Sequence, residues 1–285
     1  MKESANSGLK ILEDREFRKI AAFVEDKVGI KMPESKKLMM QSRLQARLKA
    51  LGLPNFQSYV NYVFSSEQTG NEEVILLIDA ITTNLTHFYR EPNHFQYMTT
   101  DAIPSLLNSG LTRLNIWSAG CSSGEEPYTL AMVTEEYKKA NPDAWFDYSI
   151  LATDVSTKVL QKARNAIYPM DSVKSIPMDI KKSYFLKGKD REKPEVRIKP
   201  AIRQKVQFQR LNFMDDDFGL ANVMNIIFCR NVLIYFNKPT QEAVIRKFMK
   251  YLTKGGYLFL GHSETIFNMD LPLKTVAPTV FQKIY

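Results

Sequence analysis

Cysteine, histidine and long apolar runs are all scarce in this chain of 285 residues. Its two cysteines, Cys121 and Cys229, form no CxxC pair, so a disulfide framework, a structural zinc site and thiol redox chemistry are poor interpretations. The longest uncharged apolar run, residues 74–78, is too short to span a membrane. The start, MKESANSGLK, lacks the apolar segment of a secretory signal. We therefore expect a soluble cytoplasmic protein.

Positive charge is plentiful and unevenly placed. The chain has 39 Lys and Arg against 31 Asp and Glu, a net charge of +8. Residues 36–49 hold five bases and no acid, and residues 174–205 hold eleven bases and four acids. Two basic stretches on a mildly acidic remainder suggest two places where an anionic partner docks. The plainer interpretation is a solvated surface, which such runs more often are.

The first eighty residues have the apolar spacing of helices. Phe17, Ile20 and Val24 recur at three and four residues, and Gly29 follows as a stop signal. No segment in this part alternates with period two, so we predict an all-α domain. Its helices are expected over residues 17–28, 35–51, 56–64 and 72–81, within a domain of residues 1–82, followed by a linker over residues 83–112.

From residue 113 onward, short apolar runs alternate with helical segments. This alternation is typical of a parallel sheet covered by helices on both faces, so we predict a doubly wound, Rossmann-like α/β domain over residues 113–285. The rhythm breaks between residues 168 and 205, which contain four prolines and the alternating run 196–198. We interpret that stretch as a small antiparallel β insertion.

A glycine-containing corner joins the first expected strand to its helix. The corner reads Gly120-Cys-Ser-Ser-Gly124, which is a weak signal for nucleotide binding because a plain turn explains it equally well. Glu125 and Glu126 follow in the first helical turn, where a dinucleotide would place its pyrophosphate. Two carboxylates would repel that group and attract a cationic ligand. Alternatively, they only complement the helix dipole.

The second expected strand ends at Asp154. An acid at this place holds a ribose diol in doubly wound folds, although Asp154 taken alone is as well explained as a helix N-cap. A nucleoside with a positively charged tail is S-adenosylmethionine. The corner and Asp154 together therefore favour a methyl donor over NAD or ATP.

Several further motifs occur together and in order. They are TNLTHFYRE at 83–91, GCSSGEEPY at 120–128, ATD at 152–154, CRNVLIYF at 229–236 and GHSE at 261–264. With these motifs the chain resembles the bacterial chemotaxis receptor methyltransferases, CheR, over nearly its whole length. The resemblance implies S-adenosylmethionine as cofactor, S-adenosylhomocysteine as product and no metal. It also implies methylation of glutamate side chains on the cytoplasmic helices of chemoreceptors, forming methyl esters for chemotactic adaptation.

The resemblance also implies roles for particular residues. Arg90 is our candidate for holding the substrate carboxylate, and Tyr235 for a second polar group facing the substrate, although an arginine is often a surface pair and a tyrosine in an apolar run is usually core. Of the two corner acids we favour Glu125 as the one facing the cofactor. The implied cofactor contacts are Asn84, Thr86, Arg90, Glu125, Asp154, Leu211, Asn212, Arg230 and Asn231.

The chemistry of such a reaction suits this chain. A glutamate side chain, with a pKa near 4.3, is already ionised at neutral pH, so no general base is needed and none of the three histidines need be catalytic. Carboxylate and sulfonium lose their charges on reaction, so a water-poor site should speed it. The main task of the protein is then alignment.

The basic stretches gain a partner through the resemblance. Receptor faces that carry glutamates are acidic, so we expect Lys36, Arg43 and Arg47 to dock them, with the two arginines presented together to solvent on one helix face. The β insertion is a possible site for a receptor C-terminal tail. We expect no nucleic acid partner and no membrane insertion.

Two alternatives stay open. A pI near 9.2 also fits a nucleic-acid methyltransferase. Against it, amino-methylating DNA enzymes usually carry Asn/Asp-Pro-Pro-aromatic after the fourth strand, where this chain has Cys229-Arg230-Asn231-Val232. A non-catalytic receptor-binding module of the same fold is the other alternative.

Overall fold

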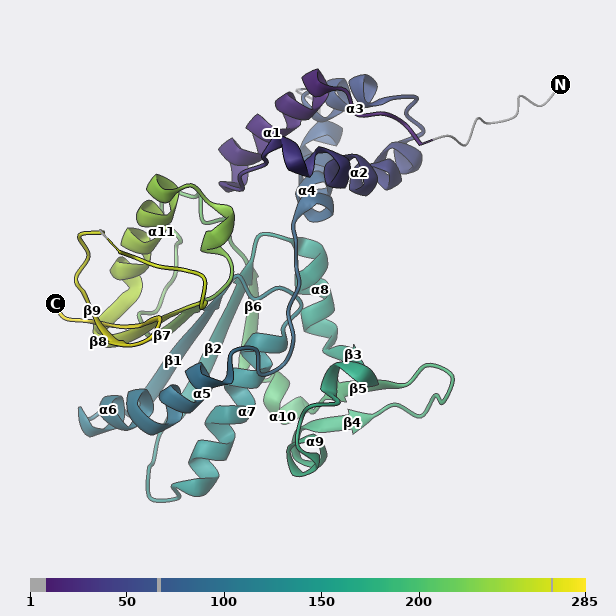
Figure 1. Ribbon diagram of the computed structural model, residues 1–285. Coiled ribbons are helices and arrows are strands. Elements are labelled where there is room, and N and C mark those ends of the chain that lie inside the picture. Colours follow the sequence, from purple (N-terminus) through teal and green to yellow (C-terminus); the bar gives the residue numbers. More distant parts are fainter. Residues whose placement is uncertain (1–8, 66–67, 268) are drawn as a thin grey trace. The chain divides into compact units, whose positions relative to one another are not determined.

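The computed structural model describes residues 9–65, 68–267 and 269–285. Most of the N-terminal segment, in which we expect no secretory signal, lies outside them. The chain divides into two compact units, Met1–Thr83 and Asn84–Tyr285 (Figure 1). Within the described residues, every helix is too short or too polar to cross a bilayer.

The first unit is all helical. Its apolar stripe is buried as the spacing predicts, since Phe17, Ile20 and Val24 are at most 2% exposed. The first helix ends at Gly29, whose φ of 73° is a left-handed conformation that glycine adopts without strain. The elements are α1 (Asp14–Val28), the 3₁₀ turn η1 (Glu34–Lys36), α2 (Lys37–Leu51), α3 (Phe56–Val63) and α4 (Gln68–Ile81).

A seven-stranded sheet forms the centre of the second unit, with strand order β6-β2-β1-β7-β8-β10-β9. The pairs from β6 to β8 are parallel, and β10 is antiparallel to both of its neighbours. This confirms the predicted doubly wound sheet. The strands are β1 (Arg113–Ala119), β2 (Asp147–Asp154), β6 (Val206–Arg210), β7 (Met224–Cys229), β8 (Leu252–Leu260), β9 (Leu273–Ala277) and β10 (Val280–Lys283).

Helices cover both faces of this sheet, with α7 and α11 on opposite sides (Figure 1). Both cysteines, Cys121 and Cys229, lie in this unit, and both are free and buried. The helices are α5 (Pro92–Tyr97), α6 (Ile103–Asn108), α7 (Glu125–Ala140), α8 (Thr157–Asn165), α9 (Met178–Tyr184), α10 (Pro200–Arg203) and α11 (Lys238–Tyr251), and the shorter turns are η2 (Met98–Ala102), η3 (Met170–Val173) and η4 (Leu233–Tyr235).

Residues 83–112, expected as a linker, carry much of their own structure. They form α5, the π turn η2 and α6, and Phe95, Met98 and Ile103 are buried in the core of the second unit. This segment therefore belongs to the second unit from Asn84 onward.

A small three-stranded sheet extends from the second unit (Figure 1). Its order is β3-β5-β4, and β5 is antiparallel to both neighbours, which confirms the predicted antiparallel insertion. Its strands are β3 (Ile167–Pro169), β4 (Phe185–Lys187) and β5 (Glu195–Ile198).

Candidate functional site

The polar residues singled out from the sequence gather at one edge of the large sheet. They follow the carboxyl ends of four adjacent strands, β6, β2, β1 and β7. Between β1 and β7 the chain changes its direction of winding, which is where doubly wound folds bind their ligands. Along this edge lie Gly120–Gly124 after β1, Asp154 at the end of β2, Leu211 and Asn212 after β6, and Arg230, Asn231 and Tyr235 after β7.

The corner after β1 is tightly built. Gly124 has a φ of 96°, and a Cβ there would lie 2.9 Å from both the Ala163 Cβ and the Tyr168 hydroxyl, so only glycine fits. The Asp154 carboxylate accepts the backbone N–H of Ser122 at 2.8 Å, and the Asp154 carbonyl accepts the N–H of Leu211 at 3.1 Å. Asp154 therefore joins the loops after three strands, and its second oxygen accepts the N–H of Ser156, as an acid capping the next turn does.

The two acids in the first turn of α7 have different surroundings. Glu126 accepts from the Ser118 hydroxyl and from Arg230 Nε, both at 2.7 Å. Glu125 is only 5% exposed and accepts from the Ser123 hydroxyl at 2.7 Å. Burial raises the pKa of Glu125, although its hydrogen bonds oppose the shift. Because Arg230 already neutralises Glu126, the arrangement favours Glu125 as the acid left for a cationic ligand.

The segment that begins the second unit passes over the corner. The Ser122 hydroxyl donates to the Asn84 carbonyl at 3.0 Å, and Arg90 Nη1 donates to the Leu85 carbonyl at 2.9 Å. Thr86 lies between them and is half-buried. Asn84, Thr86 and Arg90 therefore lie on a segment that hydrogen bonds fold over the expected donor site.

Arg230 connects this segment to the sheet. Its side chain is 2% exposed, and Nη1 donates to the Arg90 carbonyl at 2.7 Å while Nε bonds Glu126. The guanidinium also lies over the rings of Phe95 and Phe228. Because the guanidinium is buried and bonded to these protein groups, we expect any contact of Arg230 with the cofactor to come from its backbone.

Asn231 adopts a strained conformation beside it. Its φ of 59° lies in the left-handed region, and its Nδ2 donates to Glu91 Oε1 at 3.2 Å. Glu91 has a φ of 55°, so two left-handed residues face each other across this bond. The carboxylate of Glu264 accepts the backbone N–H groups that follow Arg230. Glu264 lies in the GHSE segment and had no role predicted from the sequence, because most of its partners lie about thirty residues away in the chain.

One cluster beside the site has the donor types of a metal centre. One atom each of Glu91, His94 and His262 lie within 4.8 Å of one another. However, Arg230 Nη1 is 3.5 Å from Glu91 Oε2 and 3.2 Å from His94 Nδ1. Its positive charge opposes a divalent cation at this position. Burial, with Arg230 adding to it, lowers the pKa of His94 to about 4.

The expectation that Arg43 and Arg47 project together into solvent is wrong. Arg43 Nη1 donates to the carbonyls of Ile81 and Thr82 at 2.7 and 2.9 Å. Arg47 forms a two-pronged ion pair with Glu73, at 2.9 and 2.6 Å. Both arginines are half-buried and turn toward α4, since that helix supplies a buried carboxylate, and the carbonyls at its C-terminal end need donors from outside the helix. Their place in α2 is as predicted, and their principal contacts lie inside the unit.

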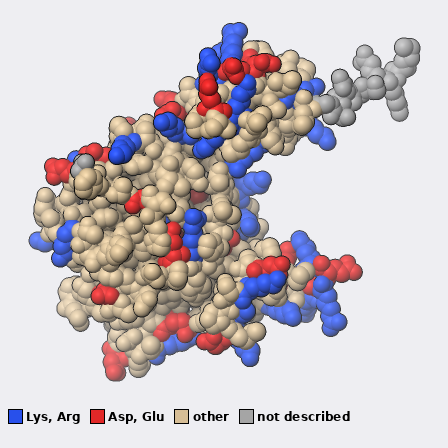
Figure 2. Space-filling model, viewed as in Figure 1, with Lys and Arg blue, Asp and Glu red and all other residues tan. Residues whose placement is uncertain are grey.

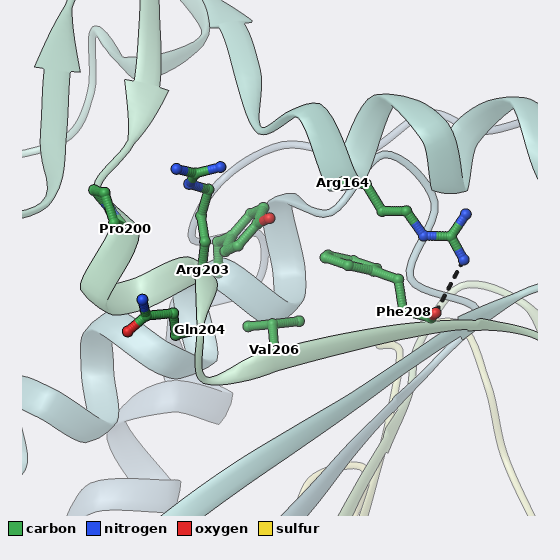
Figure 3. A pocket seen from close by; sticks show the side chains of 7 residues that line it. Arg164, Pro200, Arg203, Gln204, Val206 and Phe208 are labelled. Atoms are coloured by element: carbon green, nitrogen blue, oxygen red, sulfur yellow. Dashed lines mark hydrogen bonds between the residues drawn. The ribbon is translucent and has the colours of Figure 1, made fainter.

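The second basic stretch surrounds the small sheet. Figure 2 shows Lys and Arg side chains over this extension, intermixed with acids. Beside it, a hollow of about 370 Å³ is lined by Arg164 and Arg203 together with Tyr128, Val206 and Phe208. In Figure 3 the two guanidinium groups stand at opposite ends, and Arg164 donates to the Phe208 carbonyl at 3.0 Å. The two cations do not converge on one point, so we assign no ligand to this hollow.

Two family models match consecutive parts of the chain. Residues 15–82 match "CheR methyltransferase, all-alpha domain", and residues 84–281 match "CheR methyltransferase, SAM binding domain". The boundary between the two matches in the sequence coincides with the boundary between the two structural units.

Curated relatives match nearly the whole chain. A chemotaxis protein methyltransferase of Borreliella burgdorferi is 41% identical over 98% of this chain and 97% of its own length. One of Escherichia coli is 34% identical over 95% and 91%, and a chemotaxis protein methyltransferase 2 of Pseudomonas aeruginosa is 34% identical over 93% and 92%.

Proposed function

Because this chain belongs to the CheR methyltransferase family, we propose that it transfers the methyl group of S-adenosylmethionine to glutamate carboxylates of chemoreceptors. The products are a glutamate methyl ester and S-adenosylhomocysteine. The observation that carries the proposal is the ring of polar groups at the carboxyl ends of β6, β2, β1 and β7, placed where a doubly wound fold binds a nucleoside.

The residues present fit the proposed donor. Asp154 stands at the end of β2, as an acid that binds a ribose diol does, and Glu125 offers a buried carboxylate at the corner. Asn84, Thr86, Leu211, Asn212 and the backbone around Arg230 and Asn231 are proposed to line the rest of the donor site. When bound, S-adenosylmethionine supplies an electrophilic methyl group next to a sulfonium charge.

The chain's own task is to align the acceptor and exclude water. We propose that Arg90 holds the incoming carboxylate, because a guanidinium can donate two parallel hydrogen bonds to it. Tyr235, at the end of η4 on the same edge of the sheet, is proposed as the second polar group on the acceptor. The acceptor is already a carboxylate at neutral pH, so no residue has to remove a proton.

Docking of the acidic receptor surface is proposed for the basic stretch 36–49, which comprises the last residue of η1 and most of α2. Lys36, Arg43 and Arg47 were the candidates, but reversing either arginine would also disturb the contacts with α4. The clearer test reverses Lys36 and the exposed Lys49 together, with Lys19 and Lys31 of the same unit reversed as a control of equal charge change. We expect receptor methylation to fall only in the first variant, with S-adenosylhomocysteine affinity intact. The wild-type rate should also fall as salt rises from about 0.05 to 0.5 M.

A receptor C-terminal tail is proposed to bind the small sheet. In the pairing order β3-β5-β4 of the described strands, β4 is one of the two edge strands, and an extended peptide can add to such an edge. We further propose that the protein acts in the cytoplasm and takes no nucleic acid substrate.

The decisive experiment for the reaction uses labelled donor and receptor-containing membranes. Carboxyl methyl esters release methanol in alkali, whereas methylated bases and amines do not. Base-labile label on the receptor supports the proposal. Base-stable label, or label on added nucleic acid, would favour another acceptor, and no label with intact donor binding would favour a binding module.

A further inference from the structure

The carboxylate of Glu264 has an unusual set of partners. Its Oε1 accepts the backbone N–H groups of Val232, Leu233 and Ile234 at 2.8, 2.7 and 3.4 Å. Its Oε2 accepts the N–H of Asn231 at 2.9 Å and that of Gly261 at 2.6 Å. Five N–H groups therefore point at one side chain, which is itself only 6% exposed. Burial raises the pKa of Glu264 against the opposing effect of these hydrogen bonds.

These partners lie in the loop that carries two proposed site residues. Four of the five N–H groups belong to the consecutive residues 231–234, which run from just after β7 into η4. The loop begins with Asn231 in its left-handed conformation and ends with Tyr235. The N–H groups before and at the start of the short turn η4 have no acceptor within that turn, so they need an acceptor from elsewhere.

Gly261 packs closely against this loop and leaves no room for a side chain. A Cβ on Gly261 would lie 2.7 Å from Asn231 Nδ2 and 2.9 Å from Glu264 Oε2. The loop after β8 therefore needs a glycine to let Asn231 approach and a glutamate to hold it. Both residues belong to the GHSE segment.

We propose that Glu264 is a positioning residue for methyl transfer: its carboxylate fixes the loop 231–234, and thereby sets Asn231 against the donor and Tyr235 against the acceptor. The inference rests on the proposed function for the role of Tyr235. The part of the inference that concerns Asn231 requires only that the protein binds the methyl donor.

The test is Glu264→Gln, which keeps the size of the side chain. An amide has one oxygen acceptor, and its NH₂ group would face N–H donors, so one of the two sets of partners is lost. Glu135→Gln is the matched control. Glu135 lies in α7, away from the edge of the sheet that carries the site, and its carboxylate accepts a hydrogen bond from the Tyr148 hydroxyl. S-adenosylhomocysteine affinity, kcat and receptor KM are measured at a temperature where every variant is fully folded.

We expect Glu264→Gln to weaken S-adenosylhomocysteine binding by about tenfold and to lower kcat by tenfold or more, with a smaller change in receptor KM. Glu135→Gln should change neither affinity nor kcat by more than about twofold. A folded Glu264→Gln with wild-type affinity and kcat, and only a lower melting temperature, would overturn the proposal.

A second variant keeps the proposal testable if Glu264→Gln does not fold. Gly261→Ala keeps the glutamate but pushes both Asn231 and the Glu264 carboxylate away from their present positions, and should give the same joint loss of affinity and kcat. Normal values for Gly261→Ala would then reject the proposal. If wild-type protein forms no base-labile esters, the proposed function alone is rejected. The affinity of the variants for S-adenosylhomocysteine still tests whether Glu264 positions Asn231 for donor binding.

Discussion

Arg230 and Glu126 form a buried ion pair, with Nε and Oε2 2.7 Å apart, between the end of β7 and the first turn of α7. Their side chains are 2% and 11% exposed, so each charge depends on the other. The pair separates the roles of the two acids at the corner. Glu126 supports the loop after β7 through Arg230, whereas Glu125 accepts from the Ser123 hydroxyl and is the acid that we propose to face the sulfonium.

Asp154→Asn should weaken S-adenosylhomocysteine binding at least tenfold. The amide keeps one acceptor for the corner N–H groups but loses the charge, and charge-assisted hydrogen bonds are worth about 1.5–3 kcal/mol. Titration calorimetry measures the affinity. Asp147→Asn, at the opposite end of β2, is the control. Unchanged affinity in a folded Asp154→Asn protein would rule out the ribose assignment.

Tyr235→Phe should lower kcat about tenfold while S-adenosylhomocysteine affinity stays within about twofold of wild type. The variant removes one hydroxyl, and a lost hydrogen bond of about 1.4 kcal/mol corresponds to tenfold. Tyr251→Phe on α11 loses a hydroxyl bonded to Asp217 and should leave kcat unchanged. A parallel fall in donor affinity would make Tyr235 a cofactor contact instead of a substrate contact.

Arg47→Met should destabilise the helical unit by about 3–5 kcal/mol, because it leaves the carboxylate of Glu73 buried without its cation. Urea unfolding followed by circular dichroism measures the change. Lys49→Met, at an exposed position of the same helix, should have little effect. Equal stability of the two variants would show that the ion pair contributes little.

His94 should make the fold sensitive to acid. Burial, reinforced by Arg230, lowers its pKa to about 4 from a usual 6.5, so below pH 6.5 the unfolded chain binds a proton that the folded chain does not. Stability should therefore fall between about pH 6.5 and 4, by up to about 3 kcal/mol, and this contribution should level off below pH 4. The difference in unfolding free energy between wild type and His94→Gln should follow that curve. A difference independent of pH would contradict it.

The helices and strands were predictable because the side chains that face the core recur in the sequence with the period of the helix or strand. Phe17, Ile20 and Val24 are in the core as their spacing requires. The positions of the corner and of Asp154 could also be predicted, since the carboxyl ends of parallel strands share one edge of the sheet. By contrast, nothing local to Arg47 indicates that its partner is Glu73, which arrives from another helix.

Other features depended on contacts between distant segments. Residues 92–108 were expected as a linker, because they show no long apolar stripe. The π turn η2 interrupts the helical period in this segment. Glu264 gave no local signal, because its five donors are backbone groups that any residue type carries. The pairing of Glu126 with Arg230, over one hundred residues away in the chain, was likewise not apparent from the sequence.

The two buried thiols make the protein its own reporter of unfolding. Cys121 and Cys229 are 1% and 0% exposed, and burial raises the pKa of both. A thiol reagent reacts with thiolate, so modification requires the structure around these residues to open. Because the chain has no other cysteine, the modification rate reads the opening of the unit Asn84–Tyr285 without any engineered label. Donor binding should slow this labelling, whereas damage confined to the helical unit should leave it unchanged.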